Sequence, residues 1–118
     1  MYEYRAKILD VYDGDTFTVQ IDLGLDVYTI QKIRLYGINT PEVRGDEKVF
    51  GKEVRDYVKN LIEGKEVTMT TYKNDKKGKY GRYLAEIWFD KDGVGEHKNN
   101  LAEHLLDKKY GKEFMKDD

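Results

Sequence analysis

Apolar residues recur at every second position near the start of the chain and at helical spacing further along. The alternation over residues 4–11, and again over residues 17–21, is typical of half-buried β-strands. Over residues 49–62 the apolar residues instead lie three and four positions apart, as they do on one face of an α-helix. This change of period predicts strands followed by an amphipathic helix, with Gly64 as its C-cap.

The remaining apolar patterns complete the predicted fold. Residues 27–36, 65–72 and 83–89 are predicted to form further strands, and residues 101–106 a short second helix. Five short strands, with one helix after the third and one at the end, match a mainly β fold with α-helices, a five-stranded Greek-key barrel of the OB type. A chain of 118 residues has room for one core, so we expect a single domain over residues 1–118.

Composition excludes several kinds of site. The chain has no cysteine, which rules out a disulfide scaffold, a thiolate zinc site and a cysteine nucleophile. Its two histidines argue against a histidine-rich metal site. The net charge of −2 argues against strong non-specific binding of nucleic acid by the whole surface.

Nothing in the sequence indicates a membrane protein. There is no run of about 18 apolar residues, the length that a membrane-spanning helix needs. Residues 1–5 lack the apolar region of a signal peptide. We therefore expect a cytoplasmic monomer with no membrane partner, although the mature form of a secreted protein would show the same features.

Three short polar runs carry the chemical information. They are Asp-Gly-Asp-Thr at residues 13–16, Arg-Leu-Tyr-Gly-Ile-Asn-Thr-Pro-Glu at residues 34–42, and Lys-Tyr-Gly-Arg at residues 79–82. A hard cation takes oxygen ligands, an attacking water needs a base, and a phosphate in the transition state needs cationic donors. The runs supply all three kinds of group, which suits metal-assisted attack of water on a phosphodiester.

Some residues of these runs also have a simpler structural role. Asp13 before a glycine is a common hairpin signal, so a turn role and a role near a metal both stay open. Asp15 adds a second negative charge to the turn without helping it to fold, and a cation explains it. An inward-facing Arg34 needs an anion, which is Asp15 or Glu42 in the protein or a phosphate of the substrate. Arg82 has the simpler role of a loop cation.

Taken in this order, the three runs resemble the staphylococcal-nuclease-like (thermonuclease) family, and the resemblance extends from Ala6 to about Leu106. It implies an OB-type barrel and a calcium-dependent nuclease that acts on DNA and RNA and leaves 3′-phosphates, with Ca²⁺ as cofactor. Single-stranded nucleic acid is the expected partner, because a barrel groove with aromatic side chains accommodates unpaired strands.

The resemblance also implies a role for each matching position. The metal ligands would be Asp15, Asn39 and the backbone carbonyl of Thr40, with Asp13 behind them; the catalytic residues would be Arg34, Glu42 and Arg82; and the substrate-binding residues would be Tyr80 and Lys79. The family usually has aspartate where Asn39 stands. An amide oxygen still ligates a cation but removes one negative charge, so we expect weaker calcium binding.

Four lysines precede the third polar run: Lys73, Lys76, Lys77 and Lys79. Most short lysine runs are solvated loops. Because this one leads directly into Tyr80 and Arg82, we favour the interpretation that it forms a positively charged rim that attracts substrate.

The alternative function is a non-catalytic OB-type module that binds nucleic acid or a protein partner. Fold alone does not separate the two, because one fold hosts many functions. Domains that lose catalysis usually lose the arginines or the glutamate first, and here Arg34, Glu42 and Arg82 are all present. The sequence therefore favours the enzyme.

Overall fold

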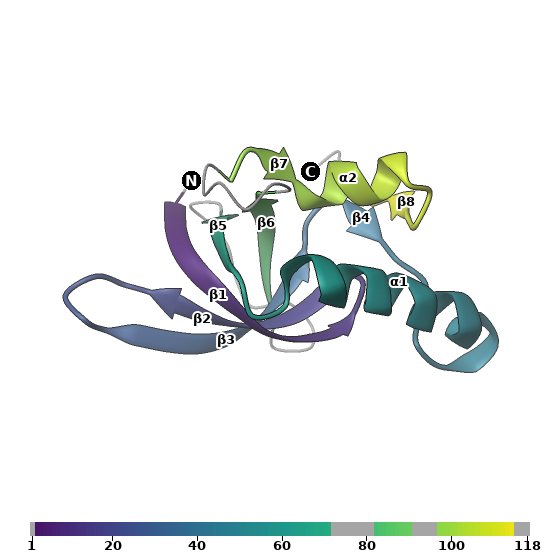
Figure 1. The fold of residues 1–118 in the computed structure, drawn as a ribbon, viewed down its shortest axis with the longest axis horizontal. Coiled ribbons are helices and arrows are strands. Elements are labelled where there is room, and N and C mark those ends of the chain that lie inside the picture. Colours follow the sequence, from purple (N-terminus) through teal and green to yellow (C-terminus); the bar gives the residue numbers. More distant parts are fainter. Residues whose placement is uncertain (1, 72–81, 91–96, 115–118) are drawn as a thin grey trace.

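The computed structural model describes residues 2–71, 82–90 and 97–114 of the chain (Figure 1). The elements in chain order are β1 (Tyr2–Asp13), β2 (Thr16–Asp22), β3 (Tyr28–Leu35), β4 (Ile38–Asn39), a 3₁₀ turn (Gly45–Glu47), α1 (Lys48–Ile62), β5 (Glu66–Thr71), β6 (Tyr83–Phe89), β7 (Asn99–Asn100), α2 (Leu101–Asp107) and β8 (Lys112–Glu113). The two helices and the five longer strands lie where the sequence predicts them.

The strands close into a barrel. The sheet order is β3-β2-β1-β5-β6-β7, and β3 also pairs with β6, which joins the two sides of the sheet. This closing pair is parallel, with Arg34 opposite Leu84, whereas the other pairs of the sheet are antiparallel. The predicted fold class, a mainly β five-stranded barrel with helices, is confirmed.

Side chains that alternate along the strands fill the inside of the barrel. Phe17, Val19 and Ile21 of β2 are buried, and their neighbours along the strand are partly exposed. This is the expected result of the period-2 pattern, because successive side chains of a strand point to opposite faces. The core therefore lies between the strands and the apolar face of α1.

Helix α1 contributes one apolar stripe to that core. Val54, Val58 and Ile62 are fully buried, at the four-residue spacing that places them on one face. The helix ends before Gly64, whose φ of +81° is the left-handed conformation predicted for a C-cap. On its outer side α1 contacts α2, where the Tyr57 hydroxyl and His104 Nε2 are 2.6 Å apart. Neither helix of the described ranges is long and apolar enough to cross a membrane.

Two short strands lie outside the barrel sheet. β4 pairs with β8 in a separate two-stranded sheet, which Figure 1 shows beside α2. Neither strand is predicted by the sequence, because two residues are too few to show a period. The pair matters because β4 follows directly on the strand that carries Arg34.

Candidate active site

A two-residue turn brings the two aspartates of the first polar run into the interior. Gly14 and Asp15 form the turn, and Asp13 pairs with Thr16 across it. The N–H of Asp15 donates to Oδ1 of Asp13 at 3.1 Å, so Asp13 does stabilise the turn. The exposed fractions of Asp13 and Asp15 are only 6% and 5%. Two carboxylates in such a position must be compensated by hydrogen bonds or positive charge.

The turn is buried because Gly14 lets it pack closely. A Cβ on Gly14 would lie 2.7 Å from Cγ1 of Val54 and 2.8 Å from Oγ1 of Thr40. Only glycine therefore fits between α1 and the segment that follows β4. The sequence predicts a glycine here for the turn; the structure adds close packing as a second reason.

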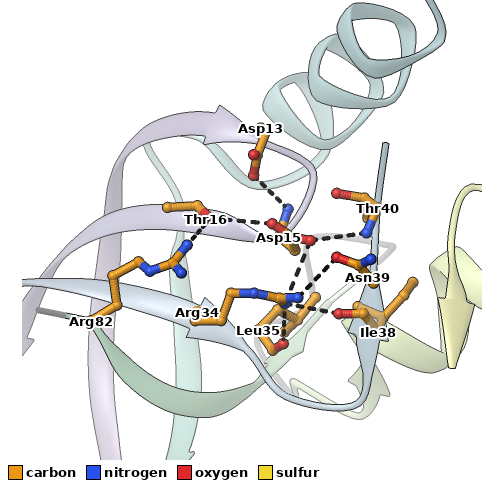
Figure 2. Close-up of polar contacts among 9 residues, drawn as sticks. All are labelled: Asp13, Asp15, Thr16, Arg34, Leu35, Ile38, Asn39, Thr40 and Arg82. Atoms are coloured by element: carbon orange, nitrogen blue, oxygen red, sulfur yellow. Dashed lines mark hydrogen bonds and ion pairs between the residues drawn. The ribbon is translucent and has the colours of Figure 1, made fainter. Parts of the chain in front are cut away.

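The carboxylate of Asp15 is the centre of the site (Figure 2). Its Oδ2 accepts the N–H of Thr40 at 2.9 Å and lies 3.4 Å from Nη1 of Arg34. Its Oδ1 accepts the hydroxyl of Thr16 at 3.1 Å. Both oxygens are thus hydrogen-bonded, and the negative charge has a cationic partner.

Arg34 is held in a fixed position by the chain that follows it. Nη1 donates to the carbonyls of Leu35 and Ile38, each at 2.8 Å, and Nη2 donates to Oδ1 of Asn39 at 3.2 Å. The sequence predicts that Arg34 pairs with an anion, and in the structure that anion is Asp15. The guanidinium group of Arg34 therefore contacts both the carboxylate of Asp15 and the amide oxygen of Asn39, as Figure 2 shows.

Arg82 approaches the same turn from the start of β6. Its Nη1 donates to Oγ1 of Thr16 at 3.2 Å, and Thr16 in turn donates to Asp15 (Figure 2). Thr16 is a site residue for which the sequence predicts no role. Its place in the first polar run could have indicated a role. Thr16 directly follows Asp15, and in the sheet it pairs opposite Arg34.

Glu42 lies apart from this cluster. It is exposed, and its backbone N–H donates to Oε1 of Glu47 at 3.2 Å. The negative charge of Glu42 acts on nearby Arg44. The pKa of Arg44 is raised mainly by its interaction with the Tyr12 hydroxyl and to a smaller degree by Glu42. In the described parts of the chain, no hydrogen bond or ion pair joins the carboxylate of Glu42 to Arg34 or Asp15.

The backbone of Glu42, by contrast, is fixed by α1. A Cβ on Gly51 would lie 1.8 Å from the carbonyl oxygen of Glu42, so the first turns of the helix touch this carbonyl. Thr40 and Pro41 before it are buried. The side chain of Glu42 therefore extends into solvent from a fixed Cα position.

The buried carboxyl of Asp13 has an unusual protonation equilibrium. Burial raises its pKa to about 7, and the hydrogen bond and negative charge of Asp15 add to the increase. The hydrogen bond from the N–H of Asp15 acts in the opposite direction, but it is the smaller effect. Near neutral pH, Asp13 is thus partly protonated, which reduces the repulsion between the two acids.

The site contains oxygen atoms of the chemical type that a hard cation takes as ligands. Oδ2 of Asp15 and Oδ1 of Asn39 come from different elements and both face the same guanidinium group of Arg34. Carboxylate and amide oxygens are ligand types that calcium accepts, and here both oxygens contact Arg34. Few of these donors are charged, and residues 2–71, 82–90 and 97–114 contain no group of three or more His, Cys, Asp or Glu side chains that could hold a metal ion.

Tyr80 and Lys79 lie outside the residues that the structure describes, as do Lys73, Lys76 and Lys77. Their roles in substrate binding stay predictions.

Comparison with known proteins identifies similar sequences. Residues 32–116 match the family model for staphylococcal nuclease homologues. The chain is 35% identical over 97 residues to a thermonuclease of Staphylococcus hyicus, a match that covers 80% of this chain and 54% of the relative. It is 36% identical over 81 residues to a thermonuclease of Staphylococcus intermedius, covering 66% and 45%.

A third relative is an uncharacterized endonuclease of Escherichia coli O157:H7, 33% identical over 86 residues, with 73% of this chain and 49% of the relative covered. The chain spans about half the length of the curated relatives it matches.

Proposed function

This chain belongs to the staphylococcal nuclease family, as its three polar runs predict, and from that premise we propose that it hydrolyses phosphodiester bonds in DNA and RNA. The observation that carries the proposal is the convergence of Arg34 and Arg82 on the Asp15–Thr16 turn. With Asp13 partly protonated near pH 7, two guanidinium groups and one full carboxylate charge meet there. Two guanidinium groups brought to one turn favour an anionic ligand.

Arg34 and Arg82 are proposed to hold the scissile phosphate. Guanidinium groups present forked N–H donors that match phosphate oxygens. Donors held in place before the reaction stabilise the extra negative charge of the transition state without a cost of reorganisation. The four acceptors around Arg34 provide that fixed position.

Glu42 is proposed to be the general base. Its exposed carboxylate is free to accept a proton from water, and the packing of Gly51 against its carbonyl fixes where the side chain starts. A general base contributes about 10²–10⁴ to the rate. The distance between its carboxylate and the arginines has to shorten in the complex with substrate, as catalytic contacts often do.

Calcium is the proposed cofactor, with Asp15, Asn39 and the carbonyl of Thr40 as ligands and Asp13 behind them. When bound, the ion supplies positive charge beside the phosphate and orients the substrate. Asp15 is the only one of the side-chain ligands with a full charge.

Single-stranded DNA and RNA are the proposed substrates, cleaved by a monomer to leave 3′-phosphates. The groups of the described site that can contact phosphate are the guanidinium groups of Arg34 and Arg82, and contacts to phosphate carry no base sequence information directly. Tyr80 and Lys79 are proposed to add contacts to the nucleotide.

The test is cleavage of denatured DNA by the purified chain, in calcium and in excess chelator. Glu42→Gln is the catalytic variant, and Glu53→Gln, at another exposed glutamate, is the control. We expect short fragments only in calcium. Glu53→Gln should cleave at the wild-type rate, and Glu42→Gln should cleave at least about 10²-fold more slowly. Fragments that a 3′-phosphatase converts to free 3′-hydroxyls would support the proposed product. Intact DNA in calcium, together with a shifted band for bound DNA, would instead identify the alternative, a non-catalytic binding module.

A further inference from the structure

The last described strand, β8, is fastened to the segment that follows Arg34. Ile38 pairs with Glu113, and Asn39 pairs with Lys112. The N–H of Phe114 donates to the carbonyl of Gly37 at 3.1 Å. This places the end of the described chain directly against β4.

The contact between the two segments is close enough to require a glycine. A Cβ on Gly111 would lie 2.7 Å from Cγ1 of Ile38 and 2.8 Å from the carbonyl oxygen of Asn39. Separations below about 3 Å do not occur for real Cβ atoms. The backbone at Gly111 therefore lies directly against Ile38 and Asn39, and β4 has little room to shift.

β4 supplies two of the acceptors that hold Arg34. The carbonyl of Ile38 accepts Nη1, and Oδ1 of Asn39 accepts Nη2. A displacement of β4 would move both acceptors together. By supporting β4, β8 thus fixes the position of the guanidinium group from outside the barrel.

Phe114 adds a direct contact. Cζ of Arg34 lies over the ring of Phe114, 5.7 Å from its centroid, within the roughly 6 Å of a cation–π interaction. Phe114 is 47% exposed, so burial of the ring in the core does not explain its position. The ring faces the cation of the candidate site.

An aromatic ring restrains a guanidinium group in a way that suits phosphate binding. A carbonyl or carboxylate uses up an N–H donor of the arginine. A ring attracts the positive charge through its face and leaves the N–H donors available. The cation can therefore stay in place while its donors exchange a protein acceptor for a phosphate oxygen.

We propose that Phe114 is a positioning residue for Arg34, and that β8 with Phe114 completes the site from the C-terminal side of the fold. The inference rests on the proposed function, because it assigns Phe114 to the phosphate-binding arginine. The ring acts through Arg34 and does not itself contact the reacting atoms.

The kinetic test compares Phe114→Leu with Phe114→Tyr and Phe114→Trp on a single-stranded oligonucleotide in calcium. Loss of an exposed cation–π contact corresponds to about a two- to fivefold effect. We expect Phe114→Leu to lower kcat by that factor and to leave KM unchanged, and the two aromatic variants to retain wild-type kcat. Tyr28, a similarly exposed aromatic, is the first residue of β3, directly after the β2–β3 turn. Tyr28→Leu is the matched control and should not alter kcat. Figure 1 shows this hairpin extending away from the helices.

A double-mutant cycle separates positioning from direct substrate contact. If Phe114 acts through Arg34, Phe114→Leu should have no further effect in an Arg34→Ala background. An equal loss in both backgrounds, or a rise in KM with unchanged kcat, would mean that the ring binds substrate itself and would overturn the proposal.

A measurement without substrate keeps the inference independent of the proposed function. The Nε–H signal of Arg34 in an NMR spectrum, assigned by its absence in Arg34→Lys, should move in Phe114→Leu and stay in place in Tyr28→Leu. An unchanged signal in Phe114→Leu would overturn the contact. A wild-type protein without nuclease activity would defeat the proposed function, and with it the positioning role, while a moved signal would still establish the contact.

Discussion

Asp15 and Arg34 form an ion pair between the β1–β2 turn and β3, with 3.4 Å between Oδ2 and Nη1 and side-chain exposures of 7% and 12%. A buried pair contributes little net stability, but removal of one partner leaves an uncompensated charge, which costs about 3–5 kcal/mol. If Asp15 is removed, Nη1 of Arg34 still donates to the carbonyls of Leu35 and Ile38, which reduces that cost. Substitutions in the pair are therefore expected to affect folding as well as activity.

Arg34→Ala and Arg82→Ala should differ in stability while both lower activity. Loss of one preorganised donor lowers the rate by about 10²–10³ in each case. Arg34→Ala should also lower the free energy of unfolding by about 2–4 kcal/mol, because buried Asp15 loses its cation. Arg82 is only partly buried, so Arg82→Ala should cost about 1 kcal/mol or less. Urea unfolding and initial rates on the same preparations provide the comparison; a folded Arg82→Ala protein with full activity would show that Arg82 does not hold the phosphate.

Thr40→Val should leave both stability and activity intact. Oγ1 of Thr40 is buried and has no hydrogen-bond partner among the described residues, so its hydroxyl carries a desolvation cost without a compensating bond. Valine has the same shape and keeps the backbone N–H that Asp15 accepts and the carbonyl proposed as a metal ligand. We expect the free energy of unfolding to be unchanged or up to about 1 kcal/mol higher. Lower calcium affinity in this variant would show that the hydroxyl, and not the carbonyl, is the ligand.

Asn39→Asp should bind calcium more tightly. A carboxylate replaces a dipole with a full charge, which at the effective dielectric of a surface site is worth about 1–2 kcal/mol, or roughly tenfold in affinity. Arg34 already donates to this side chain at 3.2 Å, so the added charge also gains a partner in the absence of metal. We therefore expect thermal melts in chelator to be unchanged or slightly higher. Calorimetric titration of both proteins measures the affinity; equal values would remove position 39 from the ligand set.

Period and turn residues determine how much of this structure the sequence predicts. The alternation along β2, the stripe of Val54, Val58 and Ile62, and the C-cap at Gly64 are local features, and each lies where it is predicted. The sequence leaves Asp15, Glu42 or a substrate phosphate as the anion for Arg34, and the structure shows the pair with Asp15. These features can be read because the residues involved are close in the sequence or share one period.

Contacts between distant segments are what the sequence does not show. The bond from Arg82 to Thr16 joins residues 66 positions apart, and it depends on how β6 closes the barrel against β3. The ring of Phe114 reaches Arg34 only because β8 pairs with β4, and two-residue strands have no pattern to read. The raised pKa of Asp13 likewise arises from packing around Gly14, which places the turn against α1.

Asp13 should make the protein less stable as the pH rises through the range from about 4 to about 7. Its ordinary pKa of 3.8 applies to the unfolded chain, and burial with the neighbouring Asp15 raises the pKa in the folded protein to about 7. Between these values the folded state binds more protons than the unfolded state, so the free energy of unfolding decreases with increasing pH. Below about pH 4 both states are protonated and the penalty is absent; above about pH 7 it is complete.

Asp13→Asn should remove this penalty, because an amide accepts the N–H of Asp15 as the carboxyl does and carries no charge. We expect similar stabilities of variant and wild type near pH 4. At pH 8 we expect a gain of up to about 4 kcal/mol for the variant, since the pKa differs by about three between the two states and each unit corresponds to about 1.4 kcal/mol. Urea unfolding in chelator at pH 4, 6 and 8 measures the trend. Asp22→Asn, which changes the acceptor of the Gly24 N–H at the other hairpin turn, controls for the loss of a turn carboxylate. A gain of the same size at pH 4 and pH 8 would show that ionisation of Asp13 does not destabilise the folded protein. The variant would then act through packing.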